Sequence, residues 1–313
     1  MPESPYTPRR PSRSLSVPLR GLQMHLEVWG EATLATPERP ALLLCHGYMD
    51  VGASFQFLVD ALAEREGDSR YILALDWRGY GRTRVPPTDS FWFPDYLGDL
   101  EMLLDGRVPG LDARRQPIDL LGHSMGGNVV MHYAGVRPTF IRRLVNLEGF
   151  GLPRSEAHEA PARLARWLDE LAQPQTLRDY PDADAVAQRL RKTNPRLRPD
   201  RAAWLARRWA EPDARGRWQV LGDPAHKRVN PMVYRVEEVM AAWRRITAPV
   251  LWAEGDLTDL SGWWGDRYPR SEVEHRLAQV PRLERTLLSP CGHMLHHEQP
   301  EALAERLKAF LDA

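Results

Sequence analysis

The sequence has only two cysteines, Cys45 and Cys291, and no long hydrophobic run. Its clean apolar stretches, such as Ala41–Cys45, span only a few residues, whereas a membrane-spanning helix needs about 20. Two cysteines do not make a disulfide framework, and the N-terminal MPESPYTPRRPSRS has no apolar stretch of the kind found in secretory signals. We therefore expect a cytoplasmic protein with no membrane partner and with both thiols reduced.

Lysine is also scarce, since it occurs only at Lys192, Lys227 and Lys308. The 42 basic residues, nearly all arginine, equal the 42 acidic residues in number, so the formal net charge is zero. Because nucleic-acid binders usually carry a basic excess, we expect no nucleic-acid partner. The chain of 313 residues is 43% hydrophobic and 27% charged, which are ordinary values for a globular protein with a sizeable core.

Short apolar runs typical of buried strands alternate with helical patterns over most of the chain. The expected strands are 15–19, 23–29, 41–45, 71–75, 118–122, 144–147, 249–253 and 283–288. This alternation predicts an α/β fold with a parallel sheet. Between 152 and 246 the apolar residues follow helical spacing instead. We therefore expect a flexible Pro/Ser/Arg-rich segment at 1–13, a core formed by 14–150 and 247–313, and a helical cap inserted at 151–246.

The most specific motif is Gly122-His123-Ser124-Met125-Gly126, a Gly-x-Ser-x-Gly sequence. It directly follows an expected buried strand and directly precedes an expected helix, which is the context that a nucleophile elbow requires. Small residues are needed on either side of the serine because the chain packs closely at such a turn. The motif predicts that Ser124 is a catalytic nucleophile.

A serine hydroxyl needs a base, and His293 is the best candidate. It lies in the loop between the last expected strand and the last expected helix, and it follows Ser124 in the chain, as this architecture requires. His296 and His297 are close in sequence, but no neighbouring cysteine or carboxylate completes a recognised zinc motif. We therefore expect no metal and no cofactor.

The base in turn needs a carboxylate to hold its tautomer. Asp256 follows the expected strand 249–253 and is our first choice, because it lies at the carboxyl edge of the sheet, where ligand sites form. Asp259 and Glu148, which ends the strand at 144–147, remain alternatives. For the oxyanion hole we expect the backbone N–H groups of Tyr48 and Met125.

Together these residues resemble the α/β-hydrolase superfamily. The resemblance covers nearly the whole chain from about residue 14. It rests on His46-Gly47, on Asp76-Trp77-Arg78-Gly79-Tyr80-Gly81, on the elbow at Ser124 and on Gly292-His293. It implies an eight-stranded, mostly parallel sheet flanked by helices, with a helical cap inserted after the sixth strand. Ala253 departs from the glycine that relatives often have before the acid.

The resemblance also implies a hydrolase, and serine at the elbow selects among its subclasses. Epoxide hydrolases and haloalkane dehalogenases of this fold use an aspartate nucleophile, so their chemistry is disfavoured here. We expect a serine esterase that cleaves a small-molecule carboxylic ester or related acyl substrate through an acyl-enzyme. C–C bond hydrolysis, lactonase and perhydrolase activities remain alternatives, as does a non-catalytic ligand-binding protein on the same fold.

Overall fold

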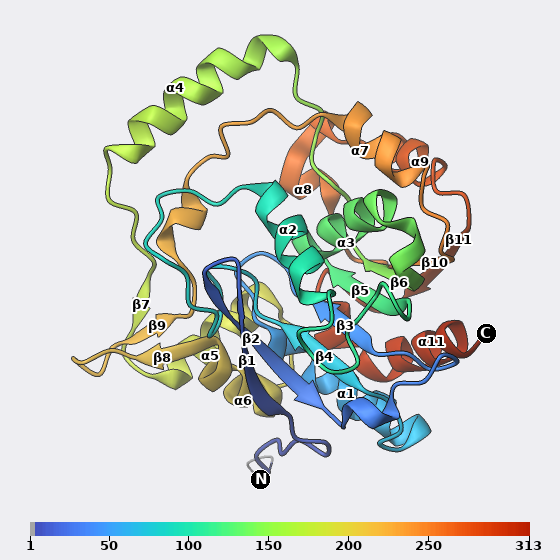
Figure 1. The fold of residues 1–313 in the computed structure, drawn as a ribbon. Helices are drawn as coiled ribbons and strands as arrows, with labels where there is room; N and C mark the ends of the chain where they lie inside the picture. The colour runs from blue at the N-terminus through green and yellow to red at the C-terminus, as the bar shows by residue number, and fades with distance from the viewer. Residues whose placement is uncertain (1–3) are drawn as a thin grey trace.

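A computed structural model describes residues 4–313 and contains one eight-stranded sheet (Figure 1). Its strands, in spatial order, are β1 (Arg13–Leu19), β2 (Leu22–Trp29), β4 (Ile72–Leu75), β3 (Leu42–Cys45), β5 (Ile118–His123), β6 (Ile141–Leu147), β10 (Val250–Gly255) and β11 (Leu283–Leu288). Strand β2 runs antiparallel to both β1 and β4, and the remaining neighbours are parallel. The predicted α/β fold with a mostly parallel sheet is therefore confirmed.

Helices cover both faces of this sheet and divide the core into two. The helices on one face are α1 (Gln56–Glu66) and α11 (Pro300–Asp312), and those on the other are α2 (Phe93–Leu103), α3 (Met125–Val136), α7 (Val236–Trp243) and α9 (Arg270–Leu277). Neighbouring strand residues point to opposite faces. Leu43 accordingly packs in the cluster with α3, whereas Leu42 and Leu44 pack in the cluster with α1. Both faces are thus buried, which is why the strands are apolar throughout.

The shorter helices lie in the connections. They are α8 (Leu260–Trp264), α10 (Leu295–Glu298) and the 3-10 turns Ala32–Leu34, Gly52–Phe55, Pro138–Phe140, Ala157–Glu159, Pro224–Lys227 and Gly265–Arg267. Among the residues that the structure describes, no helix is both long and apolar enough to cross a membrane.

The segment between β6 and β10 is the insert expected from the sequence, but it is not wholly helical. It contains α4 (Ala160–Leu171), α5 (Ala183–Thr193), α6 (Pro199–Trp209), α7 and a small antiparallel sheet of β7 (Asp179–Tyr180), β9 (Trp218–Val220) and β8 (Ala210–Pro212). These strands have only two or three residues, too few to show a period of two in the sequence. The prediction of helices alone was therefore wrong for this part.

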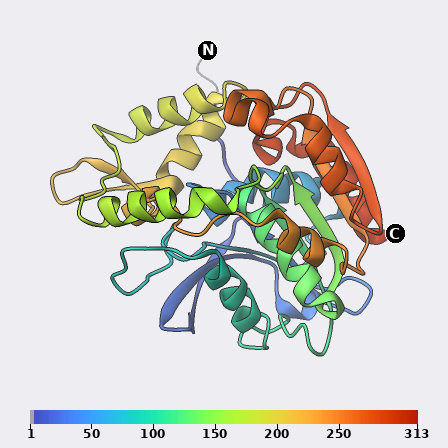
Figure 2. The ribbon, with the colours of Figure 1, turned by 90° about the horizontal axis from the view of Figure 1, so that it is seen from above.

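The parts of the insert are held to the core to different degrees. Helices α5 and α6 form a third apolar cluster together with Phe57 of α1, and α7 packs in the main core beside α3. Helix α4 has no buried residue at all. In the ribbon it lies at the periphery, joined to β6 and β7 by long extended segments (Figure 1), and from above it crosses in front of the sheet (Figure 2).

The N-terminal segment differs from the expectation of flexibility. Residues 1–3 lie outside the described residues, but the segment from Tyr6 to Arg10 is tied to α1 through Asp60. The carboxylate of Asp60 accepts hydrogen bonds from the Tyr6 hydroxyl (2.5 Å) and from the backbone N–H groups of Arg9 and Arg10 (3.0 Å each). Gln56 donates to the same carboxylate at 2.8 Å. A buried acceptor on a neighbouring helix thus orders a sequence whose composition is typical of disorder.

We expect Asp60→Ala to lower the free energy of unfolding by about 3 kcal/mol, because it leaves several donors without their charged acceptor. Urea unfolding measures this change. The matched control is Asp68→Ala. Asp68 is 71% exposed and pairs with Arg10 at 3.4 Å, so its loss costs less than about 1 kcal/mol. Equal effects of the two changes would show that the N-terminal segment is not held through Asp60.

Candidate active site

Ser124 lies at the sharp turn between β5 and α3. Its backbone has φ 51° and ψ −116°, in the left-handed region that L-residues rarely adopt. Its N–H donates to the carbonyl oxygen of Leu147 at 2.8 Å, which joins the turn to the end of β6. A Cβ built at Gly126 would lie 2.2 Å from the carbonyl oxygen of Cys45. The chain therefore passes too closely at this point for any side chain, as the predicted elbow requires.

His293 lies in the loop between β11 and α10, beside this turn. Its Nδ1 donates to Oε2 of Glu148 at 2.6 Å. Its carbonyl oxygen accepts a hydrogen bond from Nε2 of His123, the residue before the serine, at 2.9 Å. The ring of Trp263 packs edge-on against the imidazole, with 4.6 Å between centroids. Three segments thus fix the ring of His293 next to the elbow.

Glu148 directly follows β6 and also has a left-handed backbone, with φ 54°. This conformation turns its side chain into the protein, where it is 1% exposed. The Gly255 N–H donates to Oε1 at 2.7 Å, and the Thr258 hydroxyl lies 2.7 Å and 2.9 Å from the two oxygens. The carboxylate of Glu148 is therefore held from β10 and its following loop as well as by His293.

Asp256, our first choice for the partner of His293, does not contact it. Its carboxylate is exposed and accepts hydrogen bonds from the Ser289 hydroxyl (2.6 Å) and the Cys291 N–H (2.9 Å). The prediction was wrong because the turn after β10 directs the Gly255 N–H to Glu148 and the Asp256 side chain towards the loop that carries His293. Asp259, the other alternative, pairs with Ser261 at 2.5 Å.

Burial governs the protonation of this pair. Burial raises the pKa of Glu148 to about 8, against the opposing effect of the Gly255 and Thr258 donors. Burial also lowers the pKa of His293 to about 4, against a smaller opposing effect of Asp50. Both shifts have the same cause, because burial disfavours the charged form of each group. The neutral imidazole is the form that accepts a proton.

The two expected oxyanion donors belong to segments next to Ser124. Met125 is the first residue of α3, so its N–H has no acceptor within the helix. Tyr48 follows Gly47 in the turn after β3, and a Cβ built at Gly47 would lie 3.1 Å from the Cβ of Ser124. The backbone of this turn thus approaches the serine closely. The Tyr48 side chain is 51% exposed, and its hydroxyl donates to the carbonyl oxygen of His226 at 3.1 Å.

A buried polar cluster lies behind His293. The Ser54 hydroxyl donates to Asp50 at 2.9 Å and lies 3.3 Å from Nε2 of His296. One carboxylate oxygen of Asp50 and one ring nitrogen each of His296 and His297 lie within 4.8 Å of one another, a spacing that would suit a metal ion. Because the Ser54 hydroxyl already contacts both Asp50 and His296, these contacts suit a structural role. They connect the turn after β3 to α10, the helix next to His293.

His46 and Asp76 have structural roles in the loops near the elbow. Nε2 of His46 accepts a hydrogen bond from the Trp77 N–H at 3.0 Å. The carboxylate of Asp76 accepts from the N–H groups of Gly52 (2.7 Å) and Arg82 (2.8 Å). Both side chains therefore order the loops after β3 and β4 and are not available as a catalytic pair.

Sequence reasoning missed three residues that support the site, namely His123, Thr258 and Trp263. Each contacts His293 or Glu148 through tertiary structure alone. His123 carried the clearest signal, because it lies within the elbow motif. The only signal for Thr258 was its closeness in sequence to Asp256, and the only signal for Trp263 was its place in an expected loop.

The two cysteines, Cys45 and Cys291, are buried free thiols.

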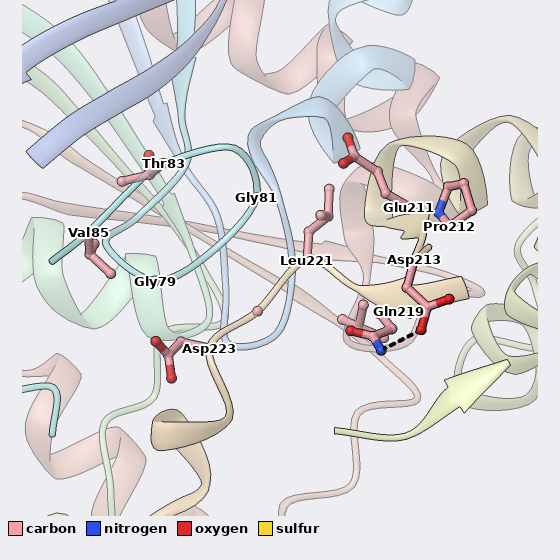
Figure 3. Close-up of a pocket in the computed structure, with 12 residues that line it drawn as sticks. Gly79, Gly81, Thr83, Val85, Glu211, Pro212, Asp213, Gln219, Leu221 and Asp223 are labelled. Carbon is pink, nitrogen blue, oxygen red and sulfur yellow. Dashed lines mark hydrogen bonds between the residues drawn. The ribbon is translucent and has the colours of Figure 1, made fainter. Parts of the chain in front are cut away.

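A cavity of about 350 Å³ lies where the insert meets the core (Figure 3). It is formed by the loop after β4, including Gly79 and Thr83, and by the small sheet of the insert. Glu211, Asp213 and Asp223 contribute carboxylates, and Gln219 donates to Asp213 at 3.3 Å. Ser124, Glu148 and His293 are not among the described residues that line it. The cavity therefore marks a junction between the two parts and is separate from the elbow.

Comparisons with known proteins agree with this architecture. Residues 42–306 match the family profile described as "Alpha/beta hydrolase family". A "Serine hydrolase-like protein" of Danio rerio is 28% identical over 209 residues, which is 64% of this chain and 59% of that protein. A "Serine hydrolase-like protein" of Dictyostelium discoideum is 21% identical over 93% of this chain and 79% of its own length. The chain thus matches only part of each relative.

A solved structure with the same fold is the "Thioesterase Domain From Curacin Biosynthetic Pathway". It has a TM-score of 0.76 and 24% sequence identity, and the match covers 95% of this chain and 99% of that one. A likeness at this level of identity establishes the fold alone.

The buried histidines predict a loss of stability in acid. Burial lowers the pKa of seven histidines: His46, His123, His132, His226, His293, His296 and His297. Below the ordinary histidine pKa of about 6.5, the unfolded chain therefore binds protons that the folded protein does not. These groups lower the stability as the pH falls, by up to about 1.4 kcal/mol per pH unit for each. The raised pKa values of Glu148 and Asp119 act in the opposite direction but involve only two groups, so the histidines dominate. We expect a clearly lower urea midpoint at pH 5.5 than at pH 7.5.

A pair of variants assigns this effect to burial. Both ring nitrogens of His297 are buried without a partner in the described chain, so His297→Phe is expected to reduce the pH dependence. His275 is exposed, and His275→Gln is expected to leave it unchanged. Equal urea midpoints at the two pH values in the unaltered protein would contradict the account of buried neutral histidines.

Proposed function

We propose a function from one premise: the chain belongs to the alpha/beta hydrolase family. We propose that it is a serine hydrolase that cleaves a small-molecule carboxylic ester or related acyl substrate. The observation that carries this proposal is the 2.6 Å hydrogen bond between His293 and Glu148 beside the elbow serine. A base held by a buried carboxylate next to a strained serine is the arrangement that nucleophilic acyl transfer needs.

Ser124 is the nucleophile in this mechanism and His293 is the base. Because Nδ1 of His293 donates to Glu148, its Nε2 carries the lone pair that removes the hydroxyl proton. The Ser124 oxygen attacks the carbonyl carbon, and the carbonyl electrons move to its oxygen. The N–H groups of Tyr48 and Met125 stabilise this oxyanion. His293 then gives its proton to the leaving group, and an acyl-enzyme forms.

Water completes the cycle by the same steps. His293 removes a proton from water, which attacks the acyl carbon, and the returning proton releases Ser124 with the carboxylic acid product. Glu148 stays hydrogen-bonded to Nδ1 throughout and stabilises the imidazolium that forms in each half-reaction. The chemistry requires no metal or cofactor. A cytoplasmic location, reduced thiols and the absence of nucleic-acid or membrane partners remain part of this proposal.

Other reactions share the same first step. Thioesters and lactones present the same electrophilic carbonyl, and the name of the curacin thioesterase domain fits acyl transfer of this kind. The C–C bond hydrolase and perhydrolase alternatives would use the same serine with different leaving groups. A non-catalytic binding protein would have no use for the hydrogen bond between Glu148 and His293. We therefore place ester or thioester hydrolysis first.

Replacing Ser124 by alanine tests the nucleophile. We expect Ser124→Ala to lose turnover by up to about a million-fold, as in the triad variants of subtilisin, while the protein stays folded. Hydrolysis of p-nitrophenyl butyrate measures the loss, and circular dichroism checks the fold. A fluorophosphonate probe should label the unaltered protein and fail to label the variant. Near-normal hydrolysis by folded Ser124→Ala would refute the proposal.

The triad acid is tested by comparing two carboxylates. We expect Glu148→Gln to lower kcat by roughly ten-thousand-fold, the size seen for a comparable change in a serine protease, because the amide cannot stabilise the imidazolium. Asp256→Asn is the matched control, since its exposed side chain contacts only the loop around Ser289 and Cys291, and it should cost less than about ten-fold. A larger loss of kcat in Asp256→Asn than in Glu148→Gln would show that Asp256 is the triad acid.

A further inference from the structure

Three ligand-type side chains from distant parts of the chain meet behind the catalytic histidine. Asp50 lies in the turn after β3, and His296 and His297 lie on α10. All three are buried, at 6%, 0% and 3% exposed respectively. Adjacent residues of a helix point about 100° apart, yet the centroids of the two imidazole rings are 4.3 Å apart. Both imidazoles therefore come close to the same carboxylate.

The ring nitrogens of this cluster lack polar partners. Neither nitrogen of His297 has a hydrogen-bond partner among the described residues, and the same holds for Nδ1 of His296. A neutral imidazole carries one N–H donor and one lone pair. Leaving such a group buried without a partner costs stability, and a bound cation supplies the partner that a lone pair needs.

We propose that Asp50, His296 and His297 bind a divalent transition-metal ion of the zinc class, which ties the turn after β3 to α10. The ion is structural, because the acyl-transfer steps derived above do not use it. The proposal is therefore independent of the hydrolase function and stands or falls on metal binding alone.

The spacing of the ligand atoms fits a tetrahedral ion. Two ligands of one zinc ion, each at about 2.1 Å and separated by the tetrahedral angle, lie about 3.4 Å apart. Oδ2 of Asp50 is 3.7 Å from Nε2 of His296. The Ser54 hydroxyl oxygen is 2.9 Å from that carboxylate oxygen and 3.3 Å from that nitrogen. These three atoms are thus spaced as one face of a tetrahedron, and His297 supplies the fourth ligand.

The ligand types select the metal. Two imidazoles and one carboxylate suit zinc, cobalt and nickel, with the Ser54 oxygen in the position that water takes in zinc sites with three protein ligands. Calcium and magnesium take six or more oxygen ligands, which these residues do not offer. Copper(I) prefers sulfur, and neither Cys45 nor Cys291 belongs to the cluster.

Aromatic side chains hold the two imidazoles and close the site. The ring of His296 packs on Phe55 with 4.7 Å between centroids, and the ring of His297 meets Phe57 edge-on at 5.7 Å. Both phenylalanines are buried. Rings that are held by packing need little rearrangement to bind an ion. A closed site is typical of structural metals, whereas catalytic zinc and iron sites keep an open position.

The cluster is close to the catalytic residues in sequence and in space. Asp50 follows the proposed oxyanion donor Tyr48 by two residues, and His296 follows His293 by three. The ring of His296 also packs against that of His123, which precedes the nucleophile, with 4.6 Å between centroids. A bound ion therefore stabilises both the oxyanion turn and the loop that carries the base.

Zinc binding tests the proposal directly. The protein is produced with added zinc and dialysed briefly against EDTA, which removes ions from exposed sites before elemental analysis. We expect one zinc ion per chain to remain. X-ray absorption at the zinc edge should show nitrogen and oxygen ligands at about 2.0–2.2 Å, with the scattering pattern of two imidazoles. Equilibrium dialysis against chelator-buffered zinc gives the affinity.

Two variants remove a ligand and are expected to keep the fold. Asp50→Asn retains the size of the side chain and an acceptor for the Ser54 hydroxyl. His297→Phe removes ring nitrogens that have no hydrogen-bond partner among the described residues. Loss of a group that only hydrogen-bonds to a metal ligand costs roughly 10–100-fold in affinity, so each variant should weaken zinc binding by at least about 100-fold. Circular dichroism checks that both are folded.

The matched controls are His275→Gln, which changes an exposed histidine, and His293→Gln, which removes the proposed base. Both should bind zinc as tightly as the unaltered protein. Zinc should raise the Tm of the unaltered protein and of both controls, but not of the two ligand variants. A folded unaltered protein that binds no zinc, or Asp50→Asn that keeps it, would overturn the proposal. Loss of zinc in His293→Gln would place the ion at the triad and overturn the proposal as well.

Discussion

The buried carboxylate of Glu148 is the interaction on which the candidate active site depends. It accepts hydrogen bonds from His293, from the Gly255 N–H and from the Thr258 hydroxyl. These donors belong to separate segments, so one side chain joins the end of β6, the end of β10 and the loop after β11. A buried carboxyl group is stable only when hydrogen-bond partners are supplied, and the donors of Gly255, Thr258 and His293 supply them.

The same constraint explains the unusual backbone around it. Glu148 and Ser124 both have positive φ, and the Ser124 N–H is bound to the last carbonyl of β6, immediately before Glu148. Strain of this kind persists only where the surrounding structure enforces it, and it is typical of functional sites. Asp256 helps to position His293 indirectly, because its carboxylate orders the Ser289–Cys291 segment that leads to His293.

Local sequence patterns were enough to predict the fold, the sharp turn at Ser124 and the loop that carries His293. Buried strands, turn glycines and the Gly-x-Ser-x-Gly context are properties of a few adjacent residues, so they can be read without tertiary contacts. The choice between Glu148 and Asp256 was different. Both follow buried strands at the same sheet edge, and only the dihedral angles of Glu148 and the direction of the Gly255 N–H decide which one reaches His293.

Other errors have the same origin. Residues 6–10 have a disordered composition, yet an acceptor at Asp60, far along the chain, holds them. The strands β7, β8 and β9 are too short to carry a pattern of their own and form only by pairing with one another. The exposure of α4 was also beyond sequence reasoning, because its leucines follow the same spacing as a buried helix face, yet none of its residues is buried.

Proton NMR of the hydrogen on Nδ1 of His293 tests the role of Glu148 most directly. A hydrogen shared between an imidazole and a buried carboxylate gives a resonance far downfield of the other protons in the protein. This resonance should be present in the unaltered protein and in Asp256→Asn, and it should be absent from Glu148→Gln. A resonance that survives in Glu148→Gln and vanishes in Asp256→Asn would contradict the assignment of Glu148 as the partner of His293.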